Sequence, residues 1–288
     1  MTARDFAPRL AQALAKVGPV CAGIDPHPAL LSAWGLDDDG PGLERFGLTM
    51  VEAAQGVAAA VKPQAALFER RGLPGMVALA SVLRAAREAD LLAILDVKRG
   101  DIGSTMAAYA EAYLGPRDAG QDAEDVLDFV ADAITVSPFL GFESLAPAID
   151  RATQCGRGIF VLALTSNPSG REVQHALRPD GRSVAAAICD AAAEHNRGRH
   201  PMGPVGLVVG ATVERGVAEA GLNLDNLNGP ILAPGFGSQG AGAAEIRAVF
   251  GAARGRVVVP SSRGLSVHGP DPTRVRAAIV RMRAELTG

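Results

Sequence analysis

The sequence predicts an α/β protein that folds as a (β/α)8 TIM barrel with extended loops. Eight short apolar runs alternate with alanine-rich segments of helical character, an order typical of a repeated strand–helix unit. The runs are continuously apolar rather than alternating, which indicates parallel strands buried on both faces. No linker divides the chain, so we expect a single domain over residues 1–288. A doubly wound open sheet uses the same units and remains the rival fold.

The apolar runs give the expected strands in chain order. They lie at residues 20–25, 59–64, 92–98, 133–137, 159–165, 206–211, 230–235 and 256–261. Helices are expected at residues 43–59, 75–89, 104–114, 143–154, 183–196, 212–220, 243–250 and 271–286. Three of these helices begin at a hydroxyl side chain of the kind that caps a helix N-terminus, namely Ser104, Ser183 and Thr212.

Two polar segments, residues 26–42 and 115–129, are longer than ordinary connections between a strand and a helix. Both contain glycine, proline and acidic residues, so we expect loops there. The run "DDD" at 37–39 is interpreted as a solvated loop face, because no histidine or second carboxylate cluster lies nearby in the sequence.

The composition excludes several classes of protein. The net charge of −3 gives no basic surface for nucleic acid, and no apolar run reaches membrane-spanning length. The N-terminus lacks the apolar core of a signal peptide. The histidines form no H-x-x-x-H pair, so a metal site is not expected. The three cysteines are far apart and are interpreted as reduced apolar residues of a cytoplasmic protein: Cys21, Cys155 and Cys189.

Lysine is rare in this chain. Only three of the 28 basic residues are lysines, at positions 16, 62 and 98, and the other twenty-five are arginines. Lysine differs from arginine in having a compact ammonium group that can give up its proton. Biased codon usage would explain Lys16, but it explains less well why Lys62 and Lys98 both stand at predicted strand ends.

Charged residues gather where the first three strands end. Asp25 follows the first strand, Lys62 lies in the second, and Asp96 and Lys98 lie in the third. Asp96 and Lys98 are two residues apart, so their side chains share a face of the strand, and Asp101 lies in the turn beyond. Barrel enzymes build their sites at these strand ends. A structural layer of ion pairs that fills the barrel is the alternative.

Glycine-rich loops follow the last two strands. Residues 233–242 and 260–264 stand where barrels commonly bind phosphate through backbone N–H groups. Arg263 would add a charged clamp and Gln239 a side-chain donor. Merely flexible turns are the alternative. Ser166 lacks the G-x-S-x-G setting of a nucleophile. The glycines expected to offer backbone to phosphate are Gly235, Gly237 and Gly264.

The run "DVKRGDIGST" is similar to the D-x-K-x-x-D signature of the orotidine 5′-phosphate decarboxylase family. The resemblance continues through "GIDP", "VKPQ", "LTSNPSG", "GLVVGAT", "APGFGSQG" and "PSSRG" in the family's order, and so covers nearly the whole barrel. The stretches "FERRG" and "TVSPFLGF" resemble the longer bacterial branch. The 115–129 segment departs from the short members, and no role is assigned to it.

The resemblance implies decarboxylation of orotidine 5′-monophosphate to UMP in de novo pyrimidine biosynthesis, with no metal or organic cofactor. It implies that Lys98 stabilises and protonates a carbanion at C6 of the pyrimidine, with Asp96 beside the departing carboxylate. Lys62 and Asp101 would hold the charged network in place. Asp101 would reach the site of the neighbouring subunit in a homodimer with shared sites.

The resemblance also implies substrate contacts away from C6. Asp25 and Thr105 would contact the ribose, Thr105 from the neighbouring subunit, and Ser166 would contact the pyrimidine. Pro234 would lie in a closing loop, while Gln239 and Arg263 bind phosphate. Two rival functions remain: a metal-dependent sugar-phosphate decarboxylase or aldolase with the same signature, and a catalytically silent UMP-binding barrel.

Overall fold

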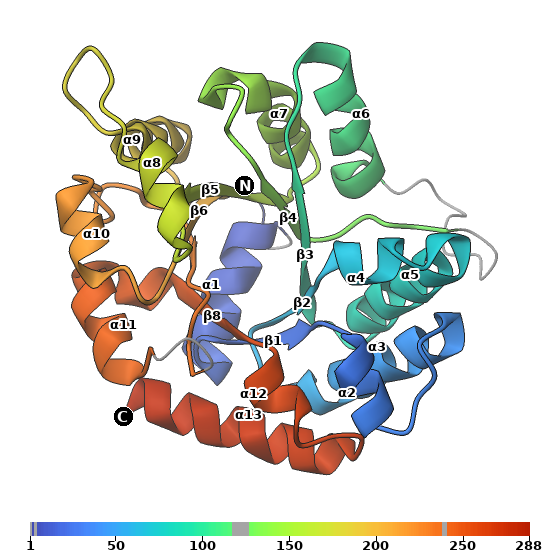
Figure 1. Ribbon diagram of the computed structural model, residues 1–288. Helices are drawn as coiled ribbons and strands as arrows, with labels where there is room; N and C mark the ends of the chain where they lie inside the picture. Colours follow the sequence, from blue (N-terminus) through green and yellow to red (C-terminus); the bar gives the residue numbers. More distant parts are fainter. Residues whose placement is uncertain (1, 3–4, 117–126, 238–240) are drawn as a thin grey trace.

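Eight parallel strands close into a barrel in the computed structural model, which describes residues 2, 5–116, 127–237 and 241–288. Each strand pairs with the next in the chain, and the last pairs with the first, Val20 opposite Val259 (Figure 1). This closure confirms the (β/α)8 barrel and excludes the open sheet. The strands are β1 Val20–Ile24, β2 Ala60–Pro63, β3 Leu92–Arg99, β4 Ala133–Val136, β5 Gly158–Leu164, β6 Val205–Val209, β7 Ile231–Leu232 and β8 Val257–Ser261.

Every expected strand is present, and β7 is much shorter than predicted. It has two residues because Pro230 and Pro234 flank it and a proline has no N–H to donate to a neighbouring strand. The β-branched and apolar side chains of the strands are buried on both faces, as the continuous apolar runs predict.

Helices surround the barrel and lie between successive strands (Figure 1). In the described residues the α-helices are α1 Phe6–Val17, α2 Pro28–Ala33, α3 Gly40–Ala54, α4 Ala65–Glu69, α5 Gly72–Glu88, α6 Gly103–Leu114, α7 Ala146–Gln154, α8 Arg171–Gln174, α9 Val184–Asn196, α10 Glu214–Glu219, α11 Ala243–Phe250, α12 Arg263–Ser266 and α13 Pro272–Thr287. Short 3-10 helices lie at η1 Phe142–Leu145, η2 Pro168–Gly170 and η3 Gly251–Arg256. None of the helices in the described ranges combines the length and apolar character needed to cross a bilayer.

One of the three predicted helix caps is correct. The Ser183 hydroxyl accepts a hydrogen bond from the Ala186 N–H at 2.9 Å and so caps α9. Ser104 is wrong as a cap because α6 already begins at Gly103, and Thr212 is wrong because α10 begins two residues later. The residues that precede these two helices, Ile102 and Val213, form no side-chain capping hydrogen bond.

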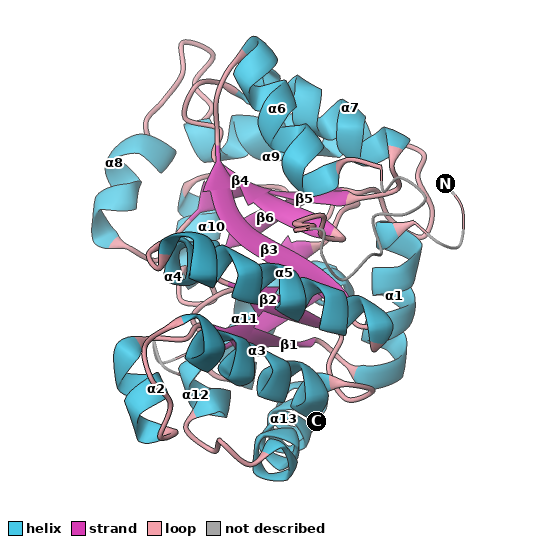
Figure 2. Cartoon of the chain, turned by 90° about the vertical axis from the view of Figure 1, so that its right-hand side faces the viewer, coloured by secondary structure: helices cyan, strands magenta, loops and turns pink. Residues whose placement is uncertain are grey.

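The apolar core has two layers, one inside the barrel and one between the barrel and the helices. Helix α1 closes one end of the inner layer, where Phe6 and Leu10 are buried. The Phe6 ring meets the Phe160 ring edge to face at 6.0 Å between centroids. Figure 2 shows α1 at one end of the barrel and α2 and α12 at the other. A pocket opens at the end where α2 and α12 lie, since Leu30 of α2 and Arg263 of α12 line it.

The prediction of a loop over residues 26–42 is wrong in part. Helix α2 forms within it, and α3 already begins at Gly40. The three aspartates of the run also differ in role: Asp37 is exposed, Asp38 forms ion pairs with Arg70 and Arg71, and Asp39 caps α3. The second predicted loop, 115–129, falls mostly on residues 117–126, which lie outside the described residues.

Candidate active site

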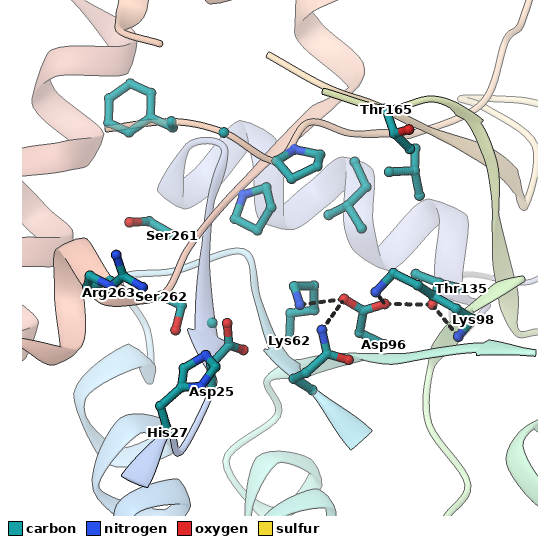
Figure 3. A pocket seen from close by; sticks show the side chains of 18 of the residues that line it. Asp25, His27, Lys62, Asp96, Lys98, Thr135, Thr165, Ser261, Ser262 and Arg263 are labelled. Carbon is teal, nitrogen blue, oxygen red and sulfur yellow. Dashed lines mark hydrogen bonds and ion pairs between the residues drawn. The ribbon is translucent and has the colours of Figure 1, made fainter. Parts of the chain in front are cut away.

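A pocket of about 440 Å³ opens at the carboxyl ends of the strands. Helix α1 lies at the opposite end of the barrel (Figure 2). Figure 3 shows two groups of polar side chains on opposite sides of this pocket. One group surrounds Asp96, and the other lies near Arg263. The predicted site residues that line it are Asp25, Lys62, Asp96, Lys98, Pro234, Gly235 and Arg263.

Asp96 is the centre of the first group and accepts four hydrogen bonds. Its Oδ2 atom lies 2.7 Å from Lys62 Nζ and 3.1 Å from Gln64 Nε2. Its Oδ1 atom lies 2.5 Å from Lys98 Nζ and 2.8 Å from the Thr135 hydroxyl. The two amines therefore hold opposite oxygens of one carboxylate, which fixes its plane (Figure 3).

The two ends of this network differ in exposure. The side chains of Lys62 and Asp96 are almost fully buried, whereas 47% of the Lys98 side chain is exposed. Burial alone would raise the pKa of Asp96, but the ammonium groups of Lys62 and Lys98 outweigh it and lower that pKa. Burial likewise opposes the charge of Lys62, and the carboxylates of Asp96 and Asp25 outweigh it and raise its pKa. A buried ion pair thus presents one accessible amine, Lys98, to the pocket.

The backbone at Lys98 is unusual for a strand. Its φ is 47°, in the left-handed region that costs a side-chain-bearing residue about 1–2 kcal/mol. The pairing of β3 with β4 shifts register between Leu95 and Arg99, and the Lys98 N–H donates to the Thr135 hydroxyl at 3.0 Å. Asp96 and Lys98 nevertheless share a face, as predicted, while Val97 packs in the outer apolar layer.

The opposite wall of the pocket carries Asp25, His27, Ser262 and Arg263 (Figure 3). The Asp25 Oδ1 atom and the Ser262 hydroxyl are buried without a hydrogen-bond partner in the described part of the chain. Gly23 makes room for Ser262, because a Cβ at Gly23 would lie 2.7 Å from the Ser262 Cβ. Buried polar atoms without partners are uncommon in folded proteins, and a bound polar ligand would supply partners here.

Comparison with known proteins identifies the family. Residues 18–277 match the model of the Orotidine 5′-phosphate decarboxylase / HUMPS family. The chain belongs to the orotidine 5′-phosphate decarboxylase family. It is 52% identical to the Salinispora arenicola orotidine 5′-phosphate decarboxylase over 287 residues, covering 98% of this chain and 99% of that one. The Streptomyces coelicolor orotidine 5′-phosphate decarboxylase is 50% identical over 282 residues, which cover 98% of this chain and 96% of that one.

Solved structures agree with this assignment. The chain superimposes with a TM-score of 0.90 on a Streptomyces avermitilis protein described as an orotidine 5′-phosphate decarboxylase. The two are 49% identical, and the match covers 99% of this chain and 96% of that one. It also resembles the Leishmania donovani OMP decarboxylase, with a TM-score of 0.73 and 28% identity over 98% and 97% of the two chains.

Several of the predicted site residues do not line this pocket. Asp101 lies in the turn after β3, where its Oδ1 atom accepts a hydrogen bond from the Ile102 N–H at 2.8 Å. Thr105 is exposed on α6, and Thr165 takes the lining position next to Ser166. Gly237 and Gly264 are exposed and do not line the pocket, and Gln239 lies outside the described residues.

Six polar lining residues were not predicted as members of this site: His27, Gln64, Thr135, Thr165, Ser261 and Ser262. Gln64 and Thr135 complete the shell around Asp96, and His27 and Ser262 stand on the opposite wall. A signal existed for two of them. Gln64 belongs to the "VKPQ" motif, and Thr135 lies near the carboxyl end of a predicted strand, where barrel enzymes place their sites.

Proposed function

We propose that this protein decarboxylates orotidine 5′-monophosphate to UMP in de novo pyrimidine biosynthesis, in the cytoplasm and without a cofactor. The observation that carries the proposal is the Lys98 ammonium, which lies 2.5 Å from a buried carboxylate and opens onto the pocket. Its strongest support is that relatives with this name align over nearly the full chain.

The chemistry needs a positive charge that can also supply a proton. When CO2 leaves C6, the electron pair of the broken bond stays in the plane of the pyrimidine ring and has no adjacent group to accept it. The Lys98 ammonium would stabilise this carbanion and then transfer its proton to C6. The products would be UMP and CO2, and the neutral amine would regain a proton from water. An arginine could supply the charge but could hardly release the proton.

Asp96 and Lys62 give this amine a fixed position. The Asp96 carboxylate is held by Lys62, Gln64 and Thr135, so it presents one oxygen to Lys98 in a defined direction. The carboxylate of the substrate would lie next to Asp96, and their mutual repulsion would be relieved as CO2 departs. Lys62 keeps the charge of Asp96 balanced in this buried place.

The opposite wall would bind the ribose and the phosphate. Asp25 has an unpartnered oxygen for a ribose hydroxyl, and Arg263 would clamp the phosphate together with Gln239. Ser166 would hydrogen-bond the pyrimidine, and Pro234 would lie over the substrate. Binding energy from the phosphate, far from C6, would close the loop after β7 and assemble the site. The backbone N–H groups proposed to bind phosphate are those of Gly235, Gly237 and Gly264.

We also propose a homodimer in which each site borrows residues from its partner. The resemblance implies Asp101 and Thr105 as site residues, but neither lines the pocket of its own chain. Apolar side chains near them face solvent: Ile102 is 61% exposed, Phe139 77% and Leu140 53%. A second copy that covered these side chains would bring its own Asp101 and Thr105 to the neighbouring pocket.

The test is the ultraviolet absorbance of orotidine 5′-monophosphate mixed with purified protein in EDTA. We expect the absorbance of the substrate to convert to that of UMP. Unchanged absorbance, with UMP still bound in a calorimetric titration, would favour a silent UMP-binding barrel. Activity that appears only when Mg²⁺ is restored would favour the metal-dependent sugar-phosphate class.

A further inference from the structure

Arg99 brings a charge into the apolar layer between the barrel and its helices. It follows Lys98 directly, and the preceding outward-facing residues of β3, Leu95 and Val97, are buried and apolar. Its guanidinium forms an ion pair with Glu69 at the end of α4. It also lies 5.5 Å from the ring centroid of Tyr109, on α6. Arg99 therefore joins the end of β3 to helices on two sides.

A second tyrosine completes the contact with α6. The Arg99 Nη2 atom donates to the Tyr113 hydroxyl at 3.3 Å, and the guanidinium carbon is 5.9 Å from the Tyr113 ring centroid. Arginine suits this place because its planar group stacks on aromatic rings while it pairs with a carboxylate, which a lysine cannot do in the same geometry.

These contacts bracket the turn that carries two proposed active-site residues. Lys98 precedes Arg99 with its backbone in the left-handed region, and Asp101 follows two residues later. The turn also packs against Ser137, the residue that follows β4. The Ser137 N–H donates to the Arg99 carbonyl at 2.8 Å. A Cβ on Gly100 would lie 2.5 Å from the Ser137 carbonyl oxygen, so only glycine fits there. Strained backbone persists only where its surroundings over-determine it.

We infer that Arg99 is a positioning residue for the decarboxylation, which holds the β3–α6 turn so that Lys98 meets Asp96 and Asp101 points out of its own pocket. The inference rests on the function proposed above. Arg99 does not line the pocket, so it acts through Lys98 and Asp101 rather than on the substrate. Its loss would leave the ribose and phosphate wall in place, because that wall is built from the segments that follow β1, β7 and β8.

The test compares Arg99→Leu with Arg9→Leu. Arg9 is a matched control, since its side chain is also 28% exposed and also bridges a helix to the barrel, through Asp132, but at the closed end. We expect Arg99→Leu to lower kcat by about 10–100-fold, as misplacement of a catalytic group does, while the Kd for UMP stays within about twofold of wild type. Arg9→Leu should keep both values. The kcat of Arg99→Lys should lie between those of wild type and Arg99→Leu, because lysine keeps the ion pair with Glu69 and loses the stacking on the tyrosine rings.

Two results would overturn the inference. One is a kcat for Arg99→Leu equal to that of Arg9→Leu, and the other is a parallel loss of kcat and UMP affinity, which would indicate general damage to the pocket. If Arg99→Leu does not fold, Tyr113→Phe and Glu69→Gln decide, because each removes one contact; unchanged kcat in both would equally reject the role. Wild-type protein that never turns over the substrate would instead reject the proposed function.

Discussion

At the scale of single residues, the site depends on which amine the fold leaves accessible. Lys62 and Lys98 contact the same carboxylate, yet the former is buried and the latter half exposed. The barrel thus uses one lysine to balance the charge of Asp96 and leaves the other free to meet a ligand. Exchange of the two roles is not possible without moving a strand, because each lysine is fixed to its own strand end.

The different exposures of Lys62 and Lys98 predict the effect of Lys98→Ala. The variant should fold and bind UMP, because the ribose and phosphate wall is untouched. Its kcat and kcat/KM should fall together by about three powers of ten or more, since both the charge and the proton are lost in the transition state. Decarboxylation kinetics over a range of substrate concentrations measure kcat and kcat/KM, and a titration with UMP checks that the variant is folded. Near-wild-type turnover by Lys98→Arg would show that this residue is not the proton donor.

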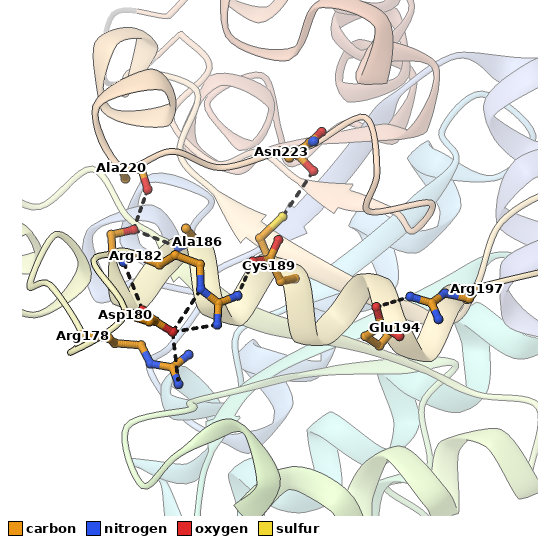
Figure 4. Close-up of polar contacts among 11 residues, drawn as sticks. Arg178, Asp180, Arg182, Ala186, Cys189, Glu194, Arg197, Ala220 and Asn223 are labelled. Carbon is orange, nitrogen blue, oxygen red and sulfur yellow. Dashed lines mark hydrogen bonds and ion pairs between the residues drawn. The ribbon is translucent and has the colours of Figure 1, made fainter.

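The buried thiols give a pH-dependent prediction. Burial raises the pKa of Cys21 and of Cys189 to about 12, and the Cys189 Sγ also lies 3.5 Å from the Asn223 carbonyl oxygen (Figure 4). Thiols of the unfolded chain ionise near 9.0. Between pH 9 and 12 the unfolded state therefore binds fewer protons than the native state. The free energy of unfolding should fall as pH rises through this window, by up to about 1.4 kcal/mol per pH unit for each thiol.

Urea denaturation at pH 9, 10 and 11 measures this fall, and thiol labelling at pH 9 tests the burial that causes it. Only the half-buried Cys155 of the native protein should react with a water-soluble disulfide reagent, whereas the chain unfolded in guanidinium should show three reactive thiols. Rapid reaction of Cys21 or Cys189 in native protein, at a rate independent of denaturant, would contradict their burial.

The charged residues of the site could be predicted from the sequence, whereas the sequence marks their uncharged partners only weakly. An aspartate or lysine at the end of an apolar strand stands out because burying an unpaired charge is costly. A threonine or glutamine at the same place is also compatible with an ordinary strand or loop. Thr135 and Gln64 acquire their roles only from the register that sets β2 and β4 on either side of Asp96. The register of a closed barrel is not visible in one strand's sequence.

At the scale of elements, the βα repeat explains which helices were predicted and which were not. The helices that follow β2, β3, β5 and the other strands were expected because an apolar run must be covered. Helix α1 precedes the first strand and lies outside the repeat, and α2, α4, α8 and α12 are too short to show a helical period. Their existence follows from tertiary contacts, such as the Arg70–Asp38 ion pair that ties the segment containing α2 to α4.

Helix α1 closes one end of the barrel, and a substitution of Phe6 tests whether this role is purely structural. The Phe6 ring is 1% exposed, and it occupies the space that a Cβ on Gly158 would fill, with the nearest ring atom at 2.1 Å. Phe6→Ala should leave a cavity and lower the free energy of unfolding by about 3–5 kcal/mol. Because α1 lies at the end opposite the pocket, kcat per folded molecule should not change (Figure 2). Urea denaturation and steady-state kinetics on the same preparation measure the two quantities; a fall in kcat without loss of stability would argue against a purely structural role.

At the scale of the whole molecule, the residues that stabilise the barrel and those proposed to carry the reaction lie at opposite ends of it. The closed end holds Phe6, Phe160 and the Arg9–Asp132 pair, and the open end holds the charged network around Asp96. The geometry of one chain still leaves Asp101 outside its own pocket. A complete site in the proposed dimer would then combine the Lys98 of one subunit with the Asp101 of the other.

A mixing experiment tests that shared site. Lys98→Ala protein and Asp101→Ala protein should each be nearly inactive alone. In a mixed dimer one site receives both substitutions and the other receives neither, so the second site should be fully active. Random pairing makes half of the dimers mixed, and roughly a quarter of all sites should therefore recover in a two-fold assembly. If Asp101 served its own subunit, every site would keep one substitution, and activity would stay near zero even though subunit exchange, followed by fluorescence transfer between labelled subunits, was complete.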